Sequence, residues 1–293
     1  MKKPIAFVPG RYYVSLSTSG TYCELNCPYC KGKYLSGMDD VTDPRMLRKV
    51  LELHYARGAR GFLLSGGFNK EGYIMISEEH LNTVKEFKRL HDDVVISIHS
   101  GLMPKELLNK VWSTGVDFID FEVPPSNKYL KYLKNLRRHS VSDYLEFVEE
   151  AIKYSRDFIV PHIVLHSAGS TINDELRVIR ELGDLKLRLI VMLIEIRGPQ
   201  GVGNSVFDVD RIREVLRYSK KFFTEVALGC MRPVAFKIKY DETVVQEGLV
   251  DRLVNPRKSI IFKYNLPVVR ACCSIKKEYF KLFPVEIKEV KLI

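Results

Sequence analysis

Three cysteines stand close together near the start of the chain, in Cys23-Glu-Leu-Asn-Cys27-Pro-Tyr-Cys30. They follow an apolar stretch that is expected to form a strand, so their thiols can all point at one small inorganic group. Thiolates are the usual ligands of iron–sulfur clusters, and a four-iron cube normally takes four of them. This loop supplies three, which would leave one iron open, as a three-ligand zinc site leaves a position open. The spacing therefore predicts an iron–sulfur cluster with an open iron.

Two other uses of these cysteines have to be weighed against a cluster. A zinc site would need a fourth ligand, yet no further cysteine lies near and the first histidine is His54. A disulfide is unexpected in a chain without a secretory signal, because cytosolic thiols stay reduced outside hyperthermophiles. The cluster is the preferred interpretation, with zinc and a disulfide as its alternatives.

The same loop resembles the signature of a known family. Cys23-x3-Cys27-x2-Cys30, with the aromatic Tyr29 directly before the last cysteine, is similar to the motif of the radical S-adenosylmethionine (SAM) superfamily. The resemblance implies a [4Fe-4S] cluster on the three cysteines, with SAM bound to the open iron and Tyr29 among the cofactor-binding residues. It also implies reductive cleavage of SAM to a 5′-deoxyadenosyl radical, and a domain built as a partial barrel of six βα units.

Short apolar segments alternate with helical ones along most of the 293 residues, of which 46% are hydrophobic. This pattern is typical of parallel βα units. It predicts an α/β protein with a partial or full (β/α) barrel over residues 1–240, and a C-terminal extension over 241–293 that crosses the barrel mouth. Chemistry in such barrels lies at the C-terminal ends of the strands. Strands are expected near 12–17, 61–65, 94–99, 116–122, 158–166, 188–195 and 225–228; helices are expected near 44–56, after Ser77, and near 104–113, 142–155, 173–182, 208–222 and 242–253.

The second expected strand ends in Ser65-Gly66-Gly67, which resembles the family's glycine-rich motif. The resemblance implies that this backbone approaches the amino group of SAM, where a side chain would block the approach. Phe68 stands where many relatives have glutamate, so Ser65, or else Asn69 or Glu71, would have to replace that contact. The alternative is a plain turn at the end of a strand.

Carboxylates follow two later strands. Asp120 and Glu122 share one face of their strand, since side chains alternate, and Glu122 could bind the ribose hydroxyls of SAM. Glu195 could meet the SAM carboxylate or a substrate. An internal salt bridge is the alternative for each. His162 and His166 are further candidates at strand ends, as proton donors, substrate ligands or structural histidines. Arg197 is another candidate, and the glycine-rich loop 197–203 is expected to cover the substrate. Residues 126–139 are expected to form a short helix or a partner-facing insert.

Three more cysteines are far apart in the sequence, yet the expected fold can bring them together. Cys230 ends a strand on the active face, and Cys272 and Cys273 stand in the tail. Adjacent cysteines hardly chelate one ion, but they can reach different irons of a cluster. Three thiolates and Ser274 are therefore predicted to hold an auxiliary [4Fe-4S] cluster. The alternative is that Cys230 is a small buried hydrophobic residue and that the pair is incidental.

The first cysteine motif and the later Gly229-Cys-Met-Arg-Pro233 together look like the biotin-synthase-related archaeal radical SAM proteins, and within them a subunit of the two-component lipoyl synthases. Bacterial-type lipoyl synthase patterns are missing. The resemblance implies sulfur insertion into an octanoyl chain on a carrier-protein lysine. The implied partners are an acidic lipoyl carrier protein, a second radical SAM subunit and an electron donor such as ferredoxin. The alternatives are another radical SAM reaction (biotin-type sulfur insertion, methylation or rearrangement) and a non-catalytic iron–sulfur carrier of electrons or sulfur.

The net charge of +10 would attract an acidic partner. It also fits a hyperthermophile surface rich in ion pairs, since the chain has only two glutamines. No basic–aromatic patch points to nucleic acid, and no apolar run reaches the roughly 20 residues of a membrane helix. The apolar start is broken by Pro9 and Gly10, unlike a signal peptide. A cytoplasmic location is expected.

Overall fold

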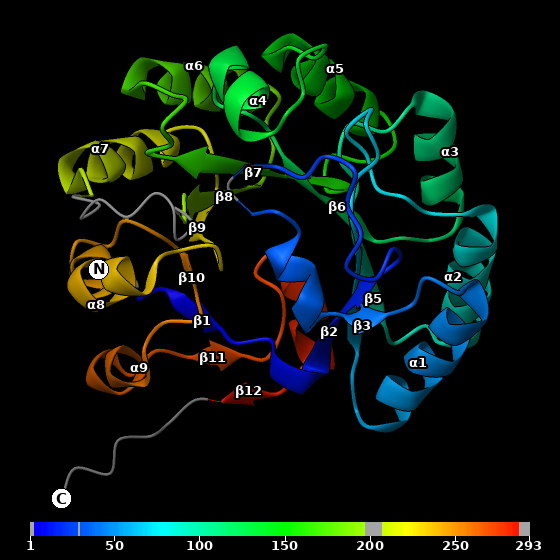
Figure 1. Cartoon of the computed structure of the whole chain (residues 1–293). Helices are drawn as coiled ribbons and strands as arrows, with labels where there is room; N and C mark the ends of the chain where they lie inside the picture. The colour runs from blue at the N-terminus through cyan, green and yellow to red at the C-terminus, as the bar shows by residue number, and fades with distance from the viewer. Residues whose placement is uncertain (1–2, 29, 197–206, 287–293) are drawn as a thin grey trace, which may run out of the picture.

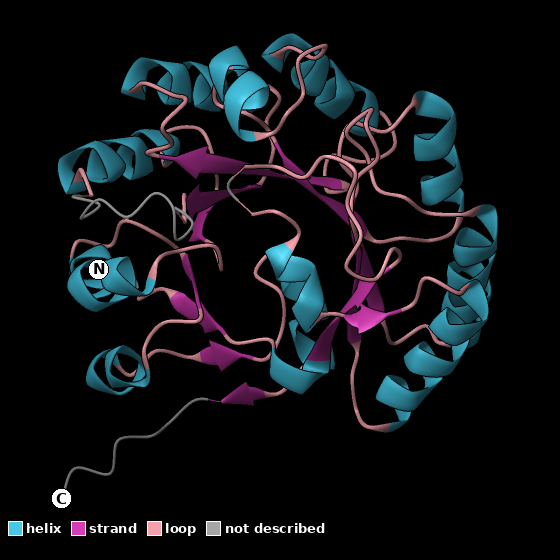
Figure 2. Ribbon diagram, viewed as in Figure 1, coloured by secondary structure: helices cyan, strands magenta, loops and turns pink. Residues whose placement is uncertain are grey.

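The computed structural model describes residues 3–28, 30–196 and 207–286. Within these ranges, twelve strands form one sheet in the order β12-β11-β1-β10-β9-β8-β7-β6-β5-β4-β2-β3. All neighbours run parallel except β11 and β12. The sheet curves round an interior and carries its helices on the outside (Figure 2), but its end strands β3 and β12 do not pair, so the barrel is not closed. The predicted α/β fold with a partial barrel is confirmed.

The elements follow one another as βα units through most of the chain (Figure 1). The strands are β1 (Ile5–Phe7), β2 (Tyr13–Ser17), β3 (Asp39–Asp40), β4 (Gly61–Ser65), β5 (Val95–His99), β6 (Phe118–Glu122), β7 (Ile159–Leu165), β8 (Leu189–Ile194), β9 (Glu225–Leu228), β10 (Arg252–Val254), β11 (Val268–Val269) and β12 (Val285–Glu286). The helices are η1 (Gly10–Tyr12), η2 (Lys33–Gly37), α1 (Pro44–Ala56), α2 (Glu78–Leu90), α3 (Lys105–Ser113), α4 (Asn127–Leu133), α5 (Val141–Ala151), α6 (Ile172–Asp184), α7 (Val209–Ser219), α8 (Val234–Gln246), α9 (Lys258–Tyr264) and η4 (Lys277–Leu282).

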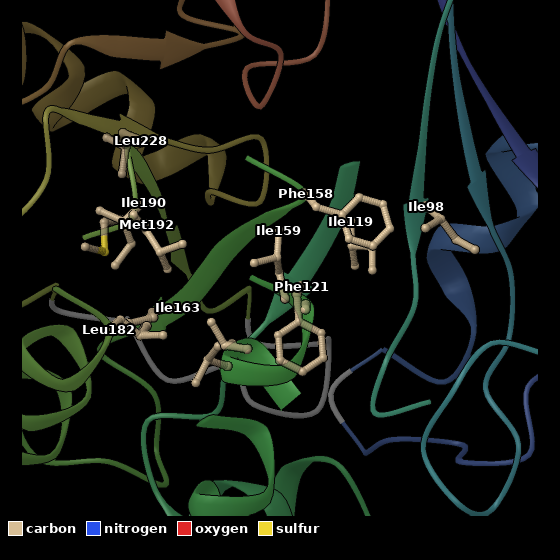
Figure 3. Close-up of a cluster of buried hydrophobic side chains, with 14 of the residues drawn as sticks. Ile98, Ile119, Phe121, Phe158, Ile159, Ile163, Leu182, Ile190, Met192 and Leu228 are labelled. Atoms are coloured by element: carbon tan, nitrogen blue, oxygen red, sulfur yellow. The ribbon is translucent and has the colours of Figure 1, made fainter. Parts of the chain in front are cut away.

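Side chains on the two faces of the strands form two separate apolar clusters. The larger cluster lies between the sheet and its helices; Figure 3 shows part of it, including Ile119, Phe121 and Ile163. The smaller cluster fills the interior and includes Val160 and Val164 of β7. Burial on both faces explains why these strands read as nearly continuous apolar runs.

Helix starts are set by polar side chains, as the sequence predicts. The Asp43 side chain accepts a hydrogen bond at the start of α1, where Pro44 takes the first helical position. Ser77 caps α2 in a capping box with His80. These caps direct each helix back along the outside of the barrel, so that the next strand runs parallel to the last.

The C-terminal region differs from the prediction in two ways. The helix expected near 242–253 lies earlier, as α8, and residues 252–254 form strand β10 beside β9 and β1. The N-terminal strand β1 was also missed, and it lies between β10 and β11. The end of the chain therefore continues the same sheet for two more parallel strands.

The tail after β11 enters the barrel from the end at which the strands begin. Arg252, in the first position of β10, donates hydrogen bonds to the carbonyl oxygens of Cys273 (2.5 Å) and Ile275 (2.7 Å). Tyr279 donates to Asp117, just before β6. The extension thus fills the floor of the barrel, and the prediction that it crosses the mouth is wrong. The buried guanidinium of Arg252, which binds the tail carbonyls, explains the difference.

In the part of the chain that the structure describes, no helix is long and apolar enough to span a membrane.

Candidate active site

The cysteine loop follows β2 and lies in front of the barrel opening in Figure 1. The Cys27 thiol donates a hydrogen bond to Cys30, and the charge of Cys23 also acts on Cys27. The sulfur of Cys23 accepts a hydrogen bond from the backbone N–H of Phe68 at 3.3 Å. The three predicted thiols are therefore brought together by one loop, beside the end of β4.

A lysine far away in the sequence favours thiolates in this loop. The hydrogen bond from Cys27 lowers the pKa of Cys30, and the ammonium group of Lys134 acts in the same direction on both thiols. Nearby positive charge and hydrogen bonding are two of the effects that stabilise a thiolate. The pKa of Cys30 is thereby lowered to about 6, whereas the hydrogen bond to Cys30 and burial raise the pKa of Cys27.

The segment 126–139, expected as a short helix or insert, forms α4 and a turn that is hydrogen-bonded to the cysteine loop. The amide of Asn135 donates to the carbonyl oxygens of Leu25 (2.8 Å) and Asn26 (3.2 Å). The Cys27 sulfur lies 3.5 Å from the carbonyl oxygen of Lys134, which is a second possible acceptor for its one hydrogen. Sequence reasoning missed Lys134 and Asn135 because nothing local links them to cysteines more than a hundred residues earlier.

Glycine at position 67 is required by the packing of the cysteine loop. A Cβ on Gly67 would lie 1.9 Å from the carbonyl oxygen of Tyr22 and 2.6 Å from the Cα of Cys23. The Gly67 N–H donates to the Ser19 hydroxyl at 2.6 Å, and the Ser65 hydroxyl lies 3.2 Å from Nδ1 of His99. The structure thus gives Ser65-Gly66-Gly67 a packing role, while their contact with SAM stays a prediction.

The two predicted carboxylate ligands are both engaged. Glu122 accepts hydrogen bonds from Tyr129 (2.9 Å) and from Lys134 (2.8 Å), which places it beside the cysteine loop. Glu195 follows β8, is buried, and accepts from the backbone N–H of Ala168 at 2.9 Å. Contact of either residue with SAM stays a prediction. Tyr29, Arg197 and the loop 197–203 lie outside the described residues.

A polar layer lies inside the barrel below this loop. Asp120 is 4% exposed, and neither of its carboxylate oxygens makes a hydrogen bond within the described chain. Nε2 of His162 lies 3.6 Å from Oδ1 of Asp120. Burial raises the pKa of Asp120, and burial lowers the pKa of His162 to about 4. Burial therefore disfavours the charged form of each group.

The later cysteines border the same layer in different ways. Desolvation of its thiol, followed by the charges of Cys272 and Asp120, raises the pKa of Cys230, although the residue as a whole is exposed. A hydrogen bond with Cys273, then burial and the charge of Asp120, raises the pKa of Cys272. Cys273 is 5% exposed and belongs to the interior apolar cluster. The half-buried Cys272 packs against the same apolar cluster as Cys273, and the charge of Asp120 acts on both Cys230 and Cys272.

Tyr34 links the two groups of cysteines. Burial raises its pKa, and so do the charges of Cys30 in the first loop and of Cys230 at the end of β9. Tyr34, a residue of η2, is thus within the range of charges from both groups of cysteines.

The remaining predicted histidine has a structural setting. His166 takes a positive φ of 55° just after β7, and its backbone N–H donates to Glu175 at 2.8 Å. Glu175 is in turn ion-paired with Arg211 at 2.5 Å. These contacts fix the turn between β7 and α6.

A surface cleft of about 570 Å³ lies away from all these residues, between α1 and the start of α2. His80 lines it, but the ring of His80 is bonded to the Val41 carbonyl (2.7 Å) and to the Ser77 hydroxyl (2.8 Å). The cleft therefore offers no reactive group comparable to those in the barrel.

A comparison with family models decides the superfamily. The model described as the radical SAM superfamily matches residues 17–182, more than half of the chain. The chain belongs to the radical SAM superfamily. No curated protein sequence gives a match. The matched range contains the cysteine loop, the turn after β4 and the ends of β5, β6 and β7.

Solved structures agree on the fold. Methylornithine synthase (PylB) superimposes with a TM-score of 0.57 at 14% identity, over 86% of this chain and 72% of that one. HydG, a maturase of the [FeFe]-hydrogenase, gives 0.56 at 12% identity over 86% and 57%. Streptococcus suis SuiB bound to S-adenosylmethionine gives 0.53 at 13% identity over 82% and 53%. At these identities the likeness shows the fold alone.

The superfamily implies a [4Fe-4S] cluster and SAM, and the donor chemistry of the first loop fits a cluster. Three thiols come from one loop, Lys134 favours the ionised forms of Cys27 and Cys30, and the Phe68 N–H donates to the sulfur of Cys23. Among the described residues, no three His, Cys, Asp or Glu side chains stand close enough to hold a single metal ion. Thiolates that bind different irons of a cluster need not meet at one point.

Proposed function

We propose that this radical SAM enzyme inserts sulfur into a protein-bound octanoyl chain, as one component of a lipoyl synthase. The observation that supports the proposal is that the charge of one buried carboxylate, Asp120, acts both on Cys230, which is exposed after β9, and on Cys272 of the tail. A second sulfur-rich site within reach of the first is what sulfur insertion needs, since the sulfur must be delivered where the substrate radical forms.

Cys23, Cys27 and Cys30 would hold the first cluster, which would supply the electron for reductive cleavage of SAM. The chain contributes binding and orientation, as proteins generally do for cofactor chemistry. Asn135 holds the backbone of the cysteine loop, and Lys134 places a positive charge beside its thiolates. Gly67 lets the loop pack against β4. The apolar interior would exclude water from an alkyl substrate.

A basic rim at the mouth supports an acidic partner. We use this name for the exposed side chains of Lys31, Lys33, Lys128, Lys131, Arg137 and Arg138. They lie on the cysteine loop and on the segment 126–139, which is hydrogen-bonded to that loop. Neither residues 25–38 nor residues 123–142 contain an Asp or Glu. Like charges gathered around an opening attract a partner of opposite sign. We propose that the partner here is the acidic lipoyl carrier protein, with a second radical SAM subunit and a ferredoxin-type electron donor completing the system.

A product assay tests the reaction. Anaerobically reconstituted protein is mixed with its partner subunit, an octanoylated carrier domain, SAM and a reductant, and the carrier peptide is analysed by mass spectrometry. The expected result is 5′-deoxyadenosine together with a thiolated octanoyl chain. Cys230→Ala is expected still to form 5′-deoxyadenosine but no thiolated octanoyl chain. Formation of 5′-deoxyadenosine without any thiolated product by the wild type would refute sulfur insertion.

The carrier contact has its own test. Reversing Lys128, Lys131 and Arg137 to glutamate is expected to raise KM for the carrier domain on the order of tenfold at low salt, with kcat little changed. A matched reversal of Lys49, Lys85 and Lys220, which lie away from the mouth on α1, on α2 and after α7, serves as control. Equal effects of the two sets would show that the basic rim does not bind the carrier.

A second candidate function is a radical SAM reaction on a small polar substrate. The observation that favours it is Asp120, whose buried carboxylate has no hydrogen bond within the described chain. An alkyl chain would leave this group unsatisfied, whereas a substrate with an amino or hydroxyl group would bond it. Consumption of SAM that depends on such a compound, and not on the octanoyl carrier, would favour this candidate.

A further inference from the structure

Polar side chains face the barrel interior from three neighbouring strands, β5, β6 and β7. Val95, Phe118 and Val160, at or next to the start of these strands, belong to the interior apolar cluster. Side chains two and four positions further along a strand point to the same face. The polar members of that face are Ser97, His99, Asp120, Glu122 and His162. This side of the interior can therefore bond a polar group of a ligand.

His162 offers this interior a hydrogen-bond acceptor that the described chain does not use. Its Nδ1 lies 3.0 Å from the carbonyl oxygen of Val160. Because a carbonyl only accepts hydrogen bonds, we assign the proton to Nδ1 and the lone pair to Nε2. Nε2 lies 3.6 Å from Oδ1 of Asp120, which is too far for a hydrogen bond, and the side chain is 13% exposed.

The imidazole of His162 is neutral at physiological pH. Burial lowers its pKa to about 4, although the hydrogen bond to Val160 and the charge of Glu122 act in the opposite direction. A neutral ring that donates through Nδ1 can only accept through Nε2. The group that suits His162 is therefore an N–H or O–H donor of a ligand.

His162 lies at the mouth end of the barrel, near the groups that hold the cysteine loop. It is in register with Glu122 across the β6–β7 pair. Glu122 accepts a hydrogen bond from Lys134 at 2.8 Å, and the carbonyl oxygen of Lys134 lies 3.5 Å from the Cys27 sulfur. A ligand bonded to His162 is therefore held close to the first site.

Apolar side chains continue the interior wall beyond His162. Leu193, near the end of β8, is 8% exposed, and Met231, after β9, is half-buried against the interior apolar cluster. An octanoyl chain joined to a lysine has matching parts, since its amide has one N–H donor and the rest is alkyl. Moving an amide N–H out of water is costly unless an acceptor binds it.

We infer that His162 determines the substrate specificity of this site: Nε2 accepts the N–H of the amide that joins the octanoyl chain to the carrier lysine. The inference rests on the proposed function, and it makes an amide-linked acyl chain the substrate, in preference to an ester-linked one. A site built to bond a substrate N–H rejects an analogue that lacks it, because the acceptor of the site is then left unpaired.

The neighbouring polar groups are less suited to this role. Glu122 already accepts from Tyr129 and Lys134. Nδ1 of His99 lies 3.2 Å from the Ser65 hydroxyl. Asp120 has no hydrogen bond within the described residues, but it is only 4% exposed and lies two residues earlier in β6 than Glu122.

The test measures binding without turnover. Anaerobically reconstituted protein with SAM and no reductant is titrated with the octanoylated carrier domain. A second titration uses an ester analogue, in which a hydroxyl analogue of lysine carries the octanoyl chain. The wild type is expected to bind the amide about tenfold more tightly than the ester, and His162→Leu is expected to bind the two alike.

Two further variants complete the comparison. His162→Gln, whose side-chain oxygen can still accept a hydrogen bond, is expected to keep part of the preference for the amide. The control is His91→Leu, because the His91 side chain is similarly exposed (17%) but pairs with Glu52 outside the barrel. It is expected to keep the full preference.

The outcomes separate this inference from the proposed function. Equal affinity of the wild type for amide and ester, or a full amide preference in His162→Leu, would overturn the inference and leave sulfur insertion to the product assay. If His162→Leu misfolds and binds neither ligand, His162→Gln decides: a reduced preference supports the inference, and an unchanged one overturns it. A wild type that does not bind the octanoylated carrier would overturn both.

Discussion

Arg252 is the side chain on which the position of the tail depends, and its replacement by methionine is the most informative stability experiment. The guanidinium is fully buried and ion-paired with Glu225 at 2.6 Å. It also donates to the carbonyls of Cys273 and Ile275. Methionine has a similar length but no donor, so two buried carbonyls would lose charged partners and Glu225 would lose its nearest cation.

The size of the effect follows from these contacts. Breaking a buried pair by removing one partner costs about 3–5 kcal/mol, and hydrogen bonds to charged groups are worth about 1.5–3 kcal/mol each. Glu225 keeps Arg188 at 2.7 Å and Lys277 at 3.3 Å, so the loss should lie near the lower end. We therefore expect the free energy of unfolding of the metal-free protein to fall by about 3 kcal/mol.

Two assays on the metal-free protein measure this. Urea unfolding gives the free energy, and the rate at which thiols react with a disulfide reagent under native conditions reports whether Cys272 and Cys273 have been released. The control is Arg270→Met, whose partner is Glu286 and whose side chain is 30% exposed; such pairs are worth about 0–1 kcal/mol. If Arg252→Met and the control differ by less than about 1 kcal/mol, and thiol reactivity is unchanged, this account of the tail is wrong.

Three further predictions concern the site. Gly67→Ala is expected to displace the cysteine loop, because its Cβ would overlap backbone atoms, and the first cluster should therefore lose iron. Gly37→Ala, with open space around it, should bind iron normally. Equal iron contents in the two variants would contradict the packing argument. Lys134→Met is expected to make the reduction potential of the first cluster more negative by about 40 mV, from an interaction of about 1 kcal/mol. A redox titration measures this potential, and the control Lys131→Met, at an exposed position, should show no shift. Burial lowers the pKa of His99 below its unfolded value of 6.5, so the unfolded chain binds the extra proton first. The stability that His99 contributes is complete above about pH 6.5 and is lost as pH falls, by up to about 1.4 kcal/mol per pH unit. In urea titrations, the difference in free energy of unfolding between wild type and His99→Gln should change with pH at this slope. A difference that does not change with pH would contradict the prediction.

Sequence reasoning located the strands of the barrel better than its ends. The apolar runs at 61–65 and 225–228 match β4 and β9 residue for residue, because both faces of those strands are buried. Strands β1, β10 and β11 have three residues or fewer, too short for any periodic pattern. The predicted helix near 242–253 failed for a related reason, since α8 has little amphipathic pattern and a buried arginine opens β10.

The candidate site shows the same division between local and distant contacts. The spacing of Cys23, Cys27 and Cys30 is local, and it was sufficient to predict one converging loop. The contacts of Lys134 and Asn135 with that loop join residues more than a hundred positions apart in the sequence, and no sequence pattern encodes them. Likewise, two adjacent cysteines look equivalent in a sequence, and only the packing of the tail shows that Cys273 is buried and Cys272 half-buried.

The central claim is that the chain carries two sulfur-based metal sites, one at the mouth and one inside the barrel. Iron and acid-labile sulfide per chain, measured with electron paramagnetic resonance on the reconstituted wild type and on the Cys23/Cys27/Cys30→Ala variant, test it most directly. The account predicts a loss of about four irons, the content of one cube, with a second cluster remaining in the variant. A wild type with about four irons that all disappear in the variant would leave a radical SAM enzyme and contradict the interior site.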